Sequence, residues 1–193
     1  SFGEMHISTT TEQVLQGSGS RYGPTAPLIA IDKVLDRNQK FAFIGKPCDL
    51  AGLRNYAQED KRVNDLVRFW LTPVCGGYMP PDSIKAFYRR MGVEPDQVTD
   101  LRYRGHGCPG PTRITTAAKV VDAHYLDFWG EDESMWDMPF RCKVCPDGIG
   151  EASDIAVADT WILGSPKRED TDTDLGTNAA IARTTAGAQL LAE

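Results

Sequence analysis

The chain has 193 residues, of which 41% are hydrophobic, and this length is enough for one well-packed domain with room for a small second one. Its net charge of −6 argues against a general nucleic-acid-binding protein, which would show a basic patch or stripe. No stretch approaches the roughly 20 apolar residues that a membrane span needs, and no secretory signal is visible. The chain also lacks an initiator methionine, so we expect a processed start or a piece of a longer protein.

The five cysteines point to metal or redox chemistry rather than to a disulfide framework. Their number is odd, no secretory signal precedes them, and two of them form the Cys-x-x-Cys pair Cys142–Cys145. Disulfides persist in oxidising compartments, whereas such a pair in a reducing cytoplasm usually binds a metal or does redox chemistry. We therefore expect a cytoplasmic protein.

The first half of the chain predicts two β-α units. Residues 1–27 are irregular, apart from a short helix that Thr10 could cap and a Gly/Ser-rich stretch at residues 17–25, and a helix is expected over 26–36. An apolar strand at 40–45 precedes a helix at 49–56, and a strand at 66–74 precedes a helix at 80–91. Two such units in succession predict an α/β domain with parallel strands.

The second half of the chain follows a less regular pattern. Residues 98–104 and 112–116 flank the glycine-rich turn 105–110 and predict a β-hairpin. Further strands are expected at 155–158 and 179–182, a last helix from 187, and a polar loop at 164–176. The predicted fold class is therefore α/β, with a mixed, partly parallel sheet with helices and an irregular, cysteine-bearing second half.

Four of the cysteines could hold one metal centre. Cys48 and Cys75 each follow an apolar strand, where a glycine-containing loop begins. Carboxyl ends of parallel strands line one edge of a sheet, where ligands usually bind, so we expect these two residues to be neighbours. Cys142 and Cys145 supply two more thiolates, and Pro146 follows as in ferredoxin-type runs. Four thiolates from three segments fit a four-iron, four-sulfur (4Fe-4S) cluster.

Two alternatives to this cluster stay open. A structural zinc site uses the same four-cysteine ligand set, although zinc ligands usually come as two close pairs and here only one pair is close. Cys48 and Cys75 could instead be buried core residues, since cysteine is often buried. Cys108, beside His106 in the glycine-rich turn, is expected to be a bystander.

The order of the motifs resembles one known family. They are Gly45–Leu53, Cys75-Gly76-Gly77, Tyr103–Gly110, Cys142–Asp147 and Ala152–Asp159. This order resembles the coenzyme F420 hydrogenase/dehydrogenase beta-subunit family, which is similar to the flavin-containing subunits of F420-reducing hydrogenase and to a chlorophyll-cycle reductase of plants. The resemblance runs from about Gly17 to the end, so residues 1–27 would be the remnant of an N-terminal region and residues 28–193 the redox domain.

The resemblance implies a 4Fe-4S cluster on the four cysteines and a bound FAD. Gly19-Ser20-Arg21-Tyr22 resembles the family's motif near the flavin, and hydroxyls, an arginine and exposed amides suit an anion. Lys46 and Arg104 could stabilise a reduced, anionic flavin, or be ordinary surface charges. The family usually has tryptophan where this chain has Cys108. The residues that would bind the flavin are Ser18, Gly19, Ser20, Arg21, Tyr22, Thr25, Lys46 and Arg104.

The resemblance thus implies an oxidoreductase subunit that links the cluster to FAD and to a two-electron substrate. That substrate could be the deazaflavin coenzyme, a pigment-like ring or a partner protein, and other subunits or a second copy of the chain are compatible partners. A non-catalytic zinc or interaction domain is the alternative from another class.

Overall fold

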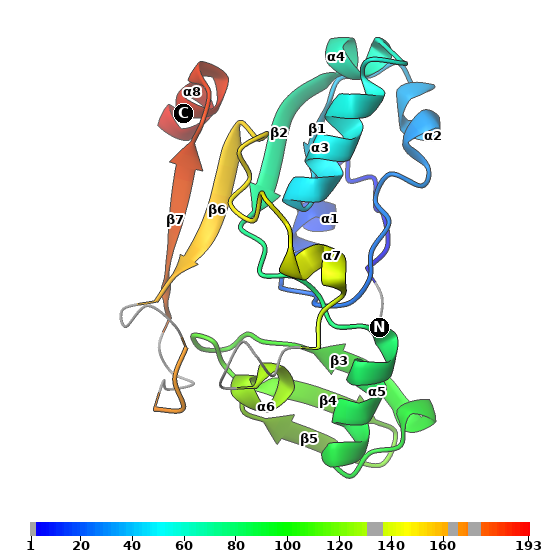
Figure 1. Cartoon of the computed structure of the whole chain (residues 1–193), viewed down its shortest axis with the longest axis vertical. Helices are drawn as coiled ribbons and strands as arrows, with labels where there is room; N and C mark the ends of the chain where they lie inside the picture. The colour runs from blue at the N-terminus through cyan, green and yellow to red at the C-terminus, as the bar shows by residue number, and fades with distance from the viewer. Residues whose placement is uncertain (1–2, 131–136, 162–165, 170–174) are drawn as a thin grey trace. The chain divides into compact units, whose positions relative to one another are not determined.

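The computed structural model describes residues 3–130, 137–161, 166–169 and 175–193 (Figure 1). They form two compact units, each built from three separate stretches of chain. Unit 1 comprises Ser1–Thr25, Gly77–Lys143 and Thr160–Thr177, and unit 2 comprises Ala26–Gly76, Val144–Asp159 and Asn178–Glu193. The expected division into an N-terminal remnant, residues 1–27, and one redox domain, residues 28–193, stays a prediction.

Unit 2 contains a four-stranded sheet in the order β1-β2-β6-β7. β1 (Phe41–Ile44) and β2 (Val67–Pro73) are parallel, and β6 (Ile155–Thr160) is parallel to β2. β7 (Thr177–Ala182) runs in the opposite direction on the outer edge (Figure 1). The predicted α/β class with a mixed, partly parallel sheet is confirmed.

The core beside this sheet receives buried aliphatic side chains from α2 (Ile31–Leu35), α3 (Pro47–Tyr56) and α4 (Arg62–Leu66). Unit 2 also contains α8 (Thr185–Ala192), which buries Gly187. Leu50 and Leu53 of α3 and Val63 of α4 are fully buried, beside Phe43 and Trp70 of the sheet. The helix expected over residues 26–36 is shorter than predicted, because residues 27–30 form turns and only Ile31–Leu35 is helical.

Unit 1 contains a three-stranded antiparallel sheet in the order β3-β4-β5. The strands are β3 (Val98–Arg102), β4 (Thr112–Thr116) and β5 (Val120–Ala123). α5 (Pro81–Arg90) lies beside this sheet (Figure 1) and buries Ile84, Phe87 and Tyr88. The other helices are α1 (Thr11–Gln16), η1 (Pro95–Gln97), α6 (Tyr125–Trp129) and α7 (Phe140–Lys143). The predicted hairpin is confirmed, while the sequence pattern missed β5, α4, α6 and α7.

No helix in the described part of the chain is both long and apolar enough to cross a membrane.

Candidate redox site

Cys48 and Cys75 follow two neighbouring parallel strands, as predicted. The two strands are joined in register, with Ile44 opposite Leu71 and the Gly45 N–H donating to the Leu71 carbonyl at 3.2 Å. Cys48 lies in the first turn of α3, where Pro47 opens the helix, rather than in a loop. Cys75 comes two residues after β2. Both cysteines therefore leave the carboxyl edge of the same sheet, and neither belongs to the buried core: Cys48 is exposed and Cys75 half-buried.

The end of β2 is tied to the segment that carries Cys145. The Cys75 N–H donates to the Gly148 carbonyl at 2.8 Å, and the Val74 N–H donates to the Val157 carbonyl at 2.7 Å. A Cβ on Gly148 would lie 3.1 Å from the Cys75 carbonyl oxygen, so glycine permits this close approach. Within unit 2, residues 144–150 thus return to the edge of the sheet from which Cys75 emerges, and Cys145 is exposed on them.

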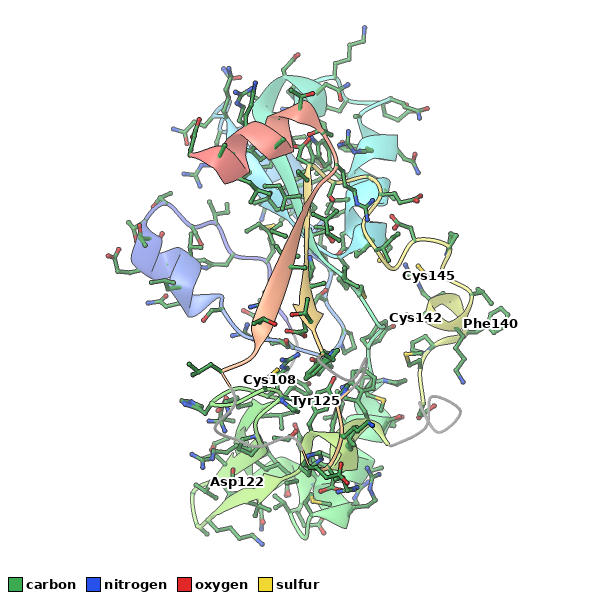
Figure 2. The ribbon with its side chains drawn as sticks, turned by 90° about the vertical axis from the view of Figure 1, so that its left-hand side faces the viewer. Cys108, Asp122, Tyr125, Phe140, Cys142 and Cys145 are labelled. Atoms are coloured by element: carbon green, nitrogen blue, oxygen red, sulfur yellow. The ribbon has the colours of Figure 1, made fainter. Side chains whose placement is uncertain are left out.

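Cys142 lies in α7 of unit 1, close to the chain that follows Cys75. A Cβ on Gly77 would lie 3.6 Å from the Cβ of Cys142 and would collide with the Met138 sulfur. Gly77 also has φ of +112°, in the region that favours glycine. Figure 2 shows Cys142 and Cys145 on one short segment that begins at Phe140. All five cysteines are thiols rather than disulfides.

Cysteine thiolates are the right type of ligand for an iron–sulfur cluster, but the described structure does not bring them together around one site. Among the described residues, no three or more His, Cys, Asp or Glu side chains lie close enough together to hold a metal ion. Metal binding itself supplies free energy that draws ligands together, so the loops of a thiolate site can stand apart without the metal. Soft thiolates fit either an iron–sulfur cluster or zinc. The assignment of Cys48, Cys75, Cys142 and Cys145 as ligands thus stays a prediction.

The Gly/Ser-rich stretch proposed for the flavin is anchored by Tyr22. Its ring lies 4.9 Å from that of Trp129 and 5.5 Å from that of Tyr103, between centroids. Its carbonyl accepts the Met79 N–H at 2.8 Å. Arg21 donates to the Gly17 carbonyl at 3.2 Å, and Gly19 has φ of +95°. Tyr22 therefore fixes the position of this loop with its ring, while Ser18, Gly19, Ser20 and Arg21 lie on the loop itself and Thr25 pairs with Gly3.

Arg104 is held between two aromatic rings in unit 1. Its guanidinium carbon lies 5.3 Å from the centroid of Trp161 and 5.9 Å from that of Tyr125. Such cation–π contacts orient a guanidinium without neutralising its charge. No sequence pattern links Trp161 or Tyr125 to Arg104, so these two neighbours could be found only from the structure.

The glycine-rich turn after Arg104 is compact. The Gly105 N–H donates to the Pro109 carbonyl at 3.0 Å, and a Cβ on Gly110 would collide with the Gly105 carbonyl. Cys108, which replaces the family's tryptophan, is buried, and a Cβ on Gly176 would lie 2.7 Å from its sulfur. Its side chain is thus enclosed by packing, and its role as a bystander stays a prediction.

Lys46 belongs to unit 2, whereas the other seven residues proposed for the flavin belong to unit 1. Its ammonium group lies 2.7 Å from the Asp49 carboxylate, which also accepts the Lys46 N–H at 2.9 Å. The structure therefore divides the proposed flavin residues between its two units.

A pocket of about 560 Å³ opens between α5 and α6 in unit 1, away from the predicted residues. Its wall contains an ion pair between Arg168 and Asp127, whose nitrogen and oxygen atoms are 2.9 Å apart. A hydrogen bond from Ser83 to Asp137 lies on the same wall. No motif in the sequence marked this pocket.

Comparison with known proteins places the chain in one family. The family defined by the C terminus of the beta subunit of coenzyme F420 hydrogenase/dehydrogenase matches residues 38–193. Among solved structures, a chain of the F420-reducing [NiFe] hydrogenase complex from Methanosarcina barkeri superposes with a TM-score of 0.65 at 18% identity. That match covers 98% of this chain but 60% of the hydrogenase chain, and the likeness therefore shows the fold alone. No curated protein matches the sequence.

Proposed function

Because this chain belongs to the coenzyme F420 hydrogenase/dehydrogenase beta-subunit family, we propose that it is an electron-transferring oxidoreductase subunit. In this proposal Cys48, Cys75, Cys142 and Cys145 hold a 4Fe-4S cluster, and FAD binds beside the Gly/Ser-rich loop and Arg104. The observation that carries the proposal is the parallel pairing of β1 with β2, which brings the chain at Cys48 and Cys75 to one edge of the sheet. The cytoplasm is the compartment in which these thiols would stay reduced.

When bound, the cluster supplies single electrons and the flavin connects them to two-electron chemistry. The chain's own contribution is to position and tune these groups. The Cys75 backbone is fixed by its hydrogen bond to Gly148, which limits the movement of one ligand. Arg104, oriented by Trp161 and Tyr125, would offset the negative charge of a reduced flavin. Lys46 would add a second cation, and its ion pair with Asp49 reduces that effect.

The substrate is proposed at the level of class. The related hydrogenase is named as F420-reducing, and the same class of two-electron acceptor is proposed for this chain. Because this chain covers 60% of that relative, other subunits or further parts of the protein would complete the reaction.

The test is anaerobic reconstitution with iron and sulfide, followed by analysis of iron, sulfide, zinc and bound flavin. We expect about four irons and four sulfides per chain, as in Cys₄ cluster ligation, and FAD released on denaturation, identified by its yellow colour and green fluorescence. Cys142→Ser or Cys145→Ser should lose iron, whereas Cys108→Ser should keep it because that thiol is enclosed beside Gly176. Tight zinc without iron would support the structural-zinc alternative. Equal iron loss in Cys108→Ser, or no loss in Cys48→Ser, would overturn the ligand assignment.

A further inference from the structure

The pocket between α5 and α6 in unit 1 has an apolar wall. This wall contains Met79, Leu126, Phe128 and Trp129, and all of these except Leu126 are buried. The volume of about 560 Å³ lies within the range of pockets that enclose small molecules. Every described lining residue belongs to unit 1, so the pocket is a feature of that unit alone.

The charged side chains that line the pocket sum to zero. Arg168 and Asp127 form an ion pair with a nitrogen–oxygen distance of 2.9 Å, and they neutralise each other. Arg90 and Asp137 also line the pocket, and among the described residues neither of them takes part in an ion pair. The pocket therefore keeps one cation and one carboxylate without a charged partner, and a ligand that complements both carries one charge of each sign.

Arg90 and Asp137 are each held by neutral groups that leave their charges unchanged. The Arg90 guanidinium donates to the Asp127 carbonyl at 3.2 Å, and its carbon lies 5.6 Å from the centroid of the Phe87 ring. The Ser83 hydroxyl donates to the Asp137 carboxylate. Side chains that are already held in place lose less conformational freedom when a ligand binds, so both charges are prepared for a partner.

The two charges are held from opposite ends of α5. Ser83, which holds Asp137, and Arg90 are seven residues apart, or about two helical turns, so they share one face of the helix. At a rise of about 1.5 Å per residue, their Cα atoms are roughly 10 Å apart. An extended peptide spans about 3.3–3.6 Å per residue, so about three residues cover this distance.

We propose that this pocket binds a short peptide of about three residues with free ends and an apolar central side chain. The carboxylate of the peptide pairs with Arg90, its ammonium group pairs with Asp137, and its central side chain packs against Phe128 and Trp129. A ligand with two charges of the same sign would place one of them against a like charge of the pocket. The site uses neither the cysteines nor the residues proposed for the flavin, so it is independent of the proposed function.

The experiment measures the binding of the tripeptide Gly-Phe-Gly to the whole chain by isothermal titration calorimetry. At about 0.15 M salt, where the Debye length is about 8 Å, we expect saturable binding at one site. Arg90→Gln and Asp137→Asn should each weaken it about fivefold, as expected for a partly exposed ion pair. Arg89→Gln and Asp96→Asn make the same charge changes at exposed residues of unit 1 outside the pocket wall, and should weaken it less than about twofold.

Two blocked peptides assign the two ends of the ligand. N-acetylated Gly-Phe-Gly has no ammonium group, so Asp137→Asn should weaken its binding no further. C-amidated Gly-Phe-Gly has no carboxylate, so Arg90→Gln should weaken its binding no further, and Arg90→Lys should bind the free tripeptide more tightly than Arg90→Gln does. Absence of saturable binding to the unaltered chain, or equal weakening by the two control variants, would overturn the proposal. Undiminished binding of either blocked peptide would overturn it as well, because the pocket would then recognise one charge alone.

Discussion

The two units of this molecule bury different kinds of core. Unit 1 packs aromatic rings around an antiparallel sheet: Phe128 lies 5.2 Å from both Phe87 and Tyr103, between ring centroids. Unit 2 packs mainly leucine, isoleucine and valine against the parallel strands of a mixed sheet, with Phe43 and Trp70 as the buried rings. Aromatic pairs gain energy from specific geometry, whereas aliphatic cores depend on filled volume.

The two units also differ in how distant stretches of chain are joined. The buried residues of the unit 1 core lie between Met79 and Trp129, with Tyr22 packed against them. In unit 2, separate stretches of chain are joined by Asp154, a buried residue far from β2 in sequence. Its carboxylate accepts the Trp70 N–H at 2.9 Å and the Thr184 hydroxyl at 2.6 Å. One unit is therefore held together by a local cluster of rings, and the other by a polar residue that connects three separate segments.

The largest effects are expected from large-to-small substitutions in the two hydrophobic cores, which test whether the units unfold separately. Phe128→Ala should destabilise unit 1 by about 4 kcal/mol, and Leu53→Ala should destabilise unit 2 by about 3 kcal/mol, because each leaves a cavity in a closed site. Hydrogen exchange should show lost amide protection in β3–β5 for the first variant and in β1 and β2 for the second. Equal loss in both units from either variant would mean that they unfold as one body.

A second test concerns the polar connection in unit 2. Asp154→Ala leaves the buried Trp70 N–H without its partner and should lower the free energy of unfolding by about 3 kcal/mol. Thr184→Val keeps the carboxylate but removes one donor to it and also the oxygen that caps α8 by accepting the Gly187 N–H, so it should cost about 2 kcal/mol. Urea denaturation measures both values. If Thr184→Val cost as much as Asp154→Ala, the hydroxyl rather than the carboxylate would be the main link.

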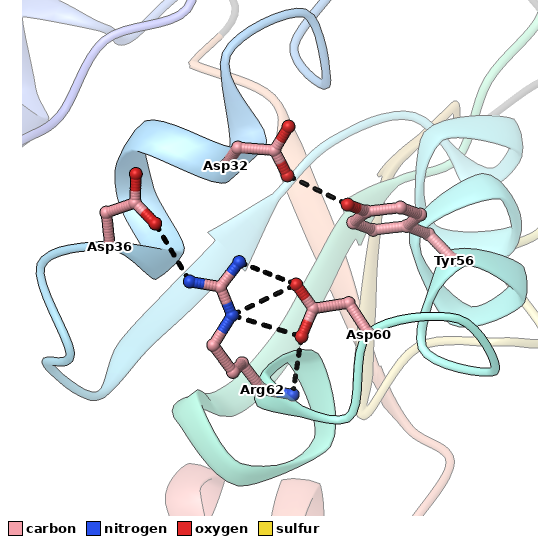
Figure 3. A network of polar contacts seen from close by, with 5 residues as sticks. All are labelled: Asp32, Asp36, Tyr56, Asp60 and Arg62. Atoms are coloured by element: carbon pink, nitrogen blue, oxygen red, sulfur yellow. Dashed lines mark hydrogen bonds and ion pairs between the residues drawn. The ribbon is translucent and has the colours of Figure 1, made fainter.

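The smallest effect is expected from the ion pairs of two surface arginines, Arg62 in unit 2 and Arg113 in unit 1. In unit 2, Arg62 donates to Asp60 and Asp36 (Figure 3), and its hydrogen bonds to Asp60 hold the pKa of that carboxyl below its ordinary value. In unit 1, Arg113 likewise lowers the pKa of Asp122. A carboxyl with a lowered pKa in the folded state stabilises it above the unfolded pKa, and this contribution is lost as the pH falls through the folded pKa.

Arg62→Gln should therefore raise the pKa of Asp60 toward its ordinary value and leave that of Asp122 unchanged. Arg113→Gln should do the reverse. Carboxyl titration by NMR at low salt measures both groups. A simultaneous shift of both pKa values in either variant would contradict the independence of the two pairs.

Sequence patterns predicted the elements that have a long apolar face and missed those that depend on a partner. The strands at Phe41–Ile44 and Val67–Pro73 and the helix at Pro81–Arg90 were found, since their apolar spacing is clear. β5 was missed because only Ala123 of its four residues is buried. Its pairing with β4 includes the Arg113–Asp122 contact across the two strands, which no local pattern encodes.

The candidate site was predictable in its residue types and only partly in its arrangement. Glycine-flanked strand ends located Cys48 and Cys75 at one edge of the sheet. The position of Cys48 inside α3 was missed, although Pro47 is a helix-opening residue. The rings beside Arg104 come from residues 21 and 57 positions further along the chain, so only the folded structure brings them together.

The assembly of each unit from three stretches of chain has a consequence for synthesis on the ribosome. Because unit 1 extends to Thr177 and unit 2 includes Asn178–Glu193, neither unit can form fully until these late stretches have been synthesised. The sheet of unit 2 begins with β1 at Phe41 and receives its last strand only with Thr177–Ala182. At about 5–20 residues per second, β1 and β2 must wait several seconds for β6 and β7. During that interval the edge of β2 stays unpaired, and the nascent chain has the greatest need of protection by a chaperone.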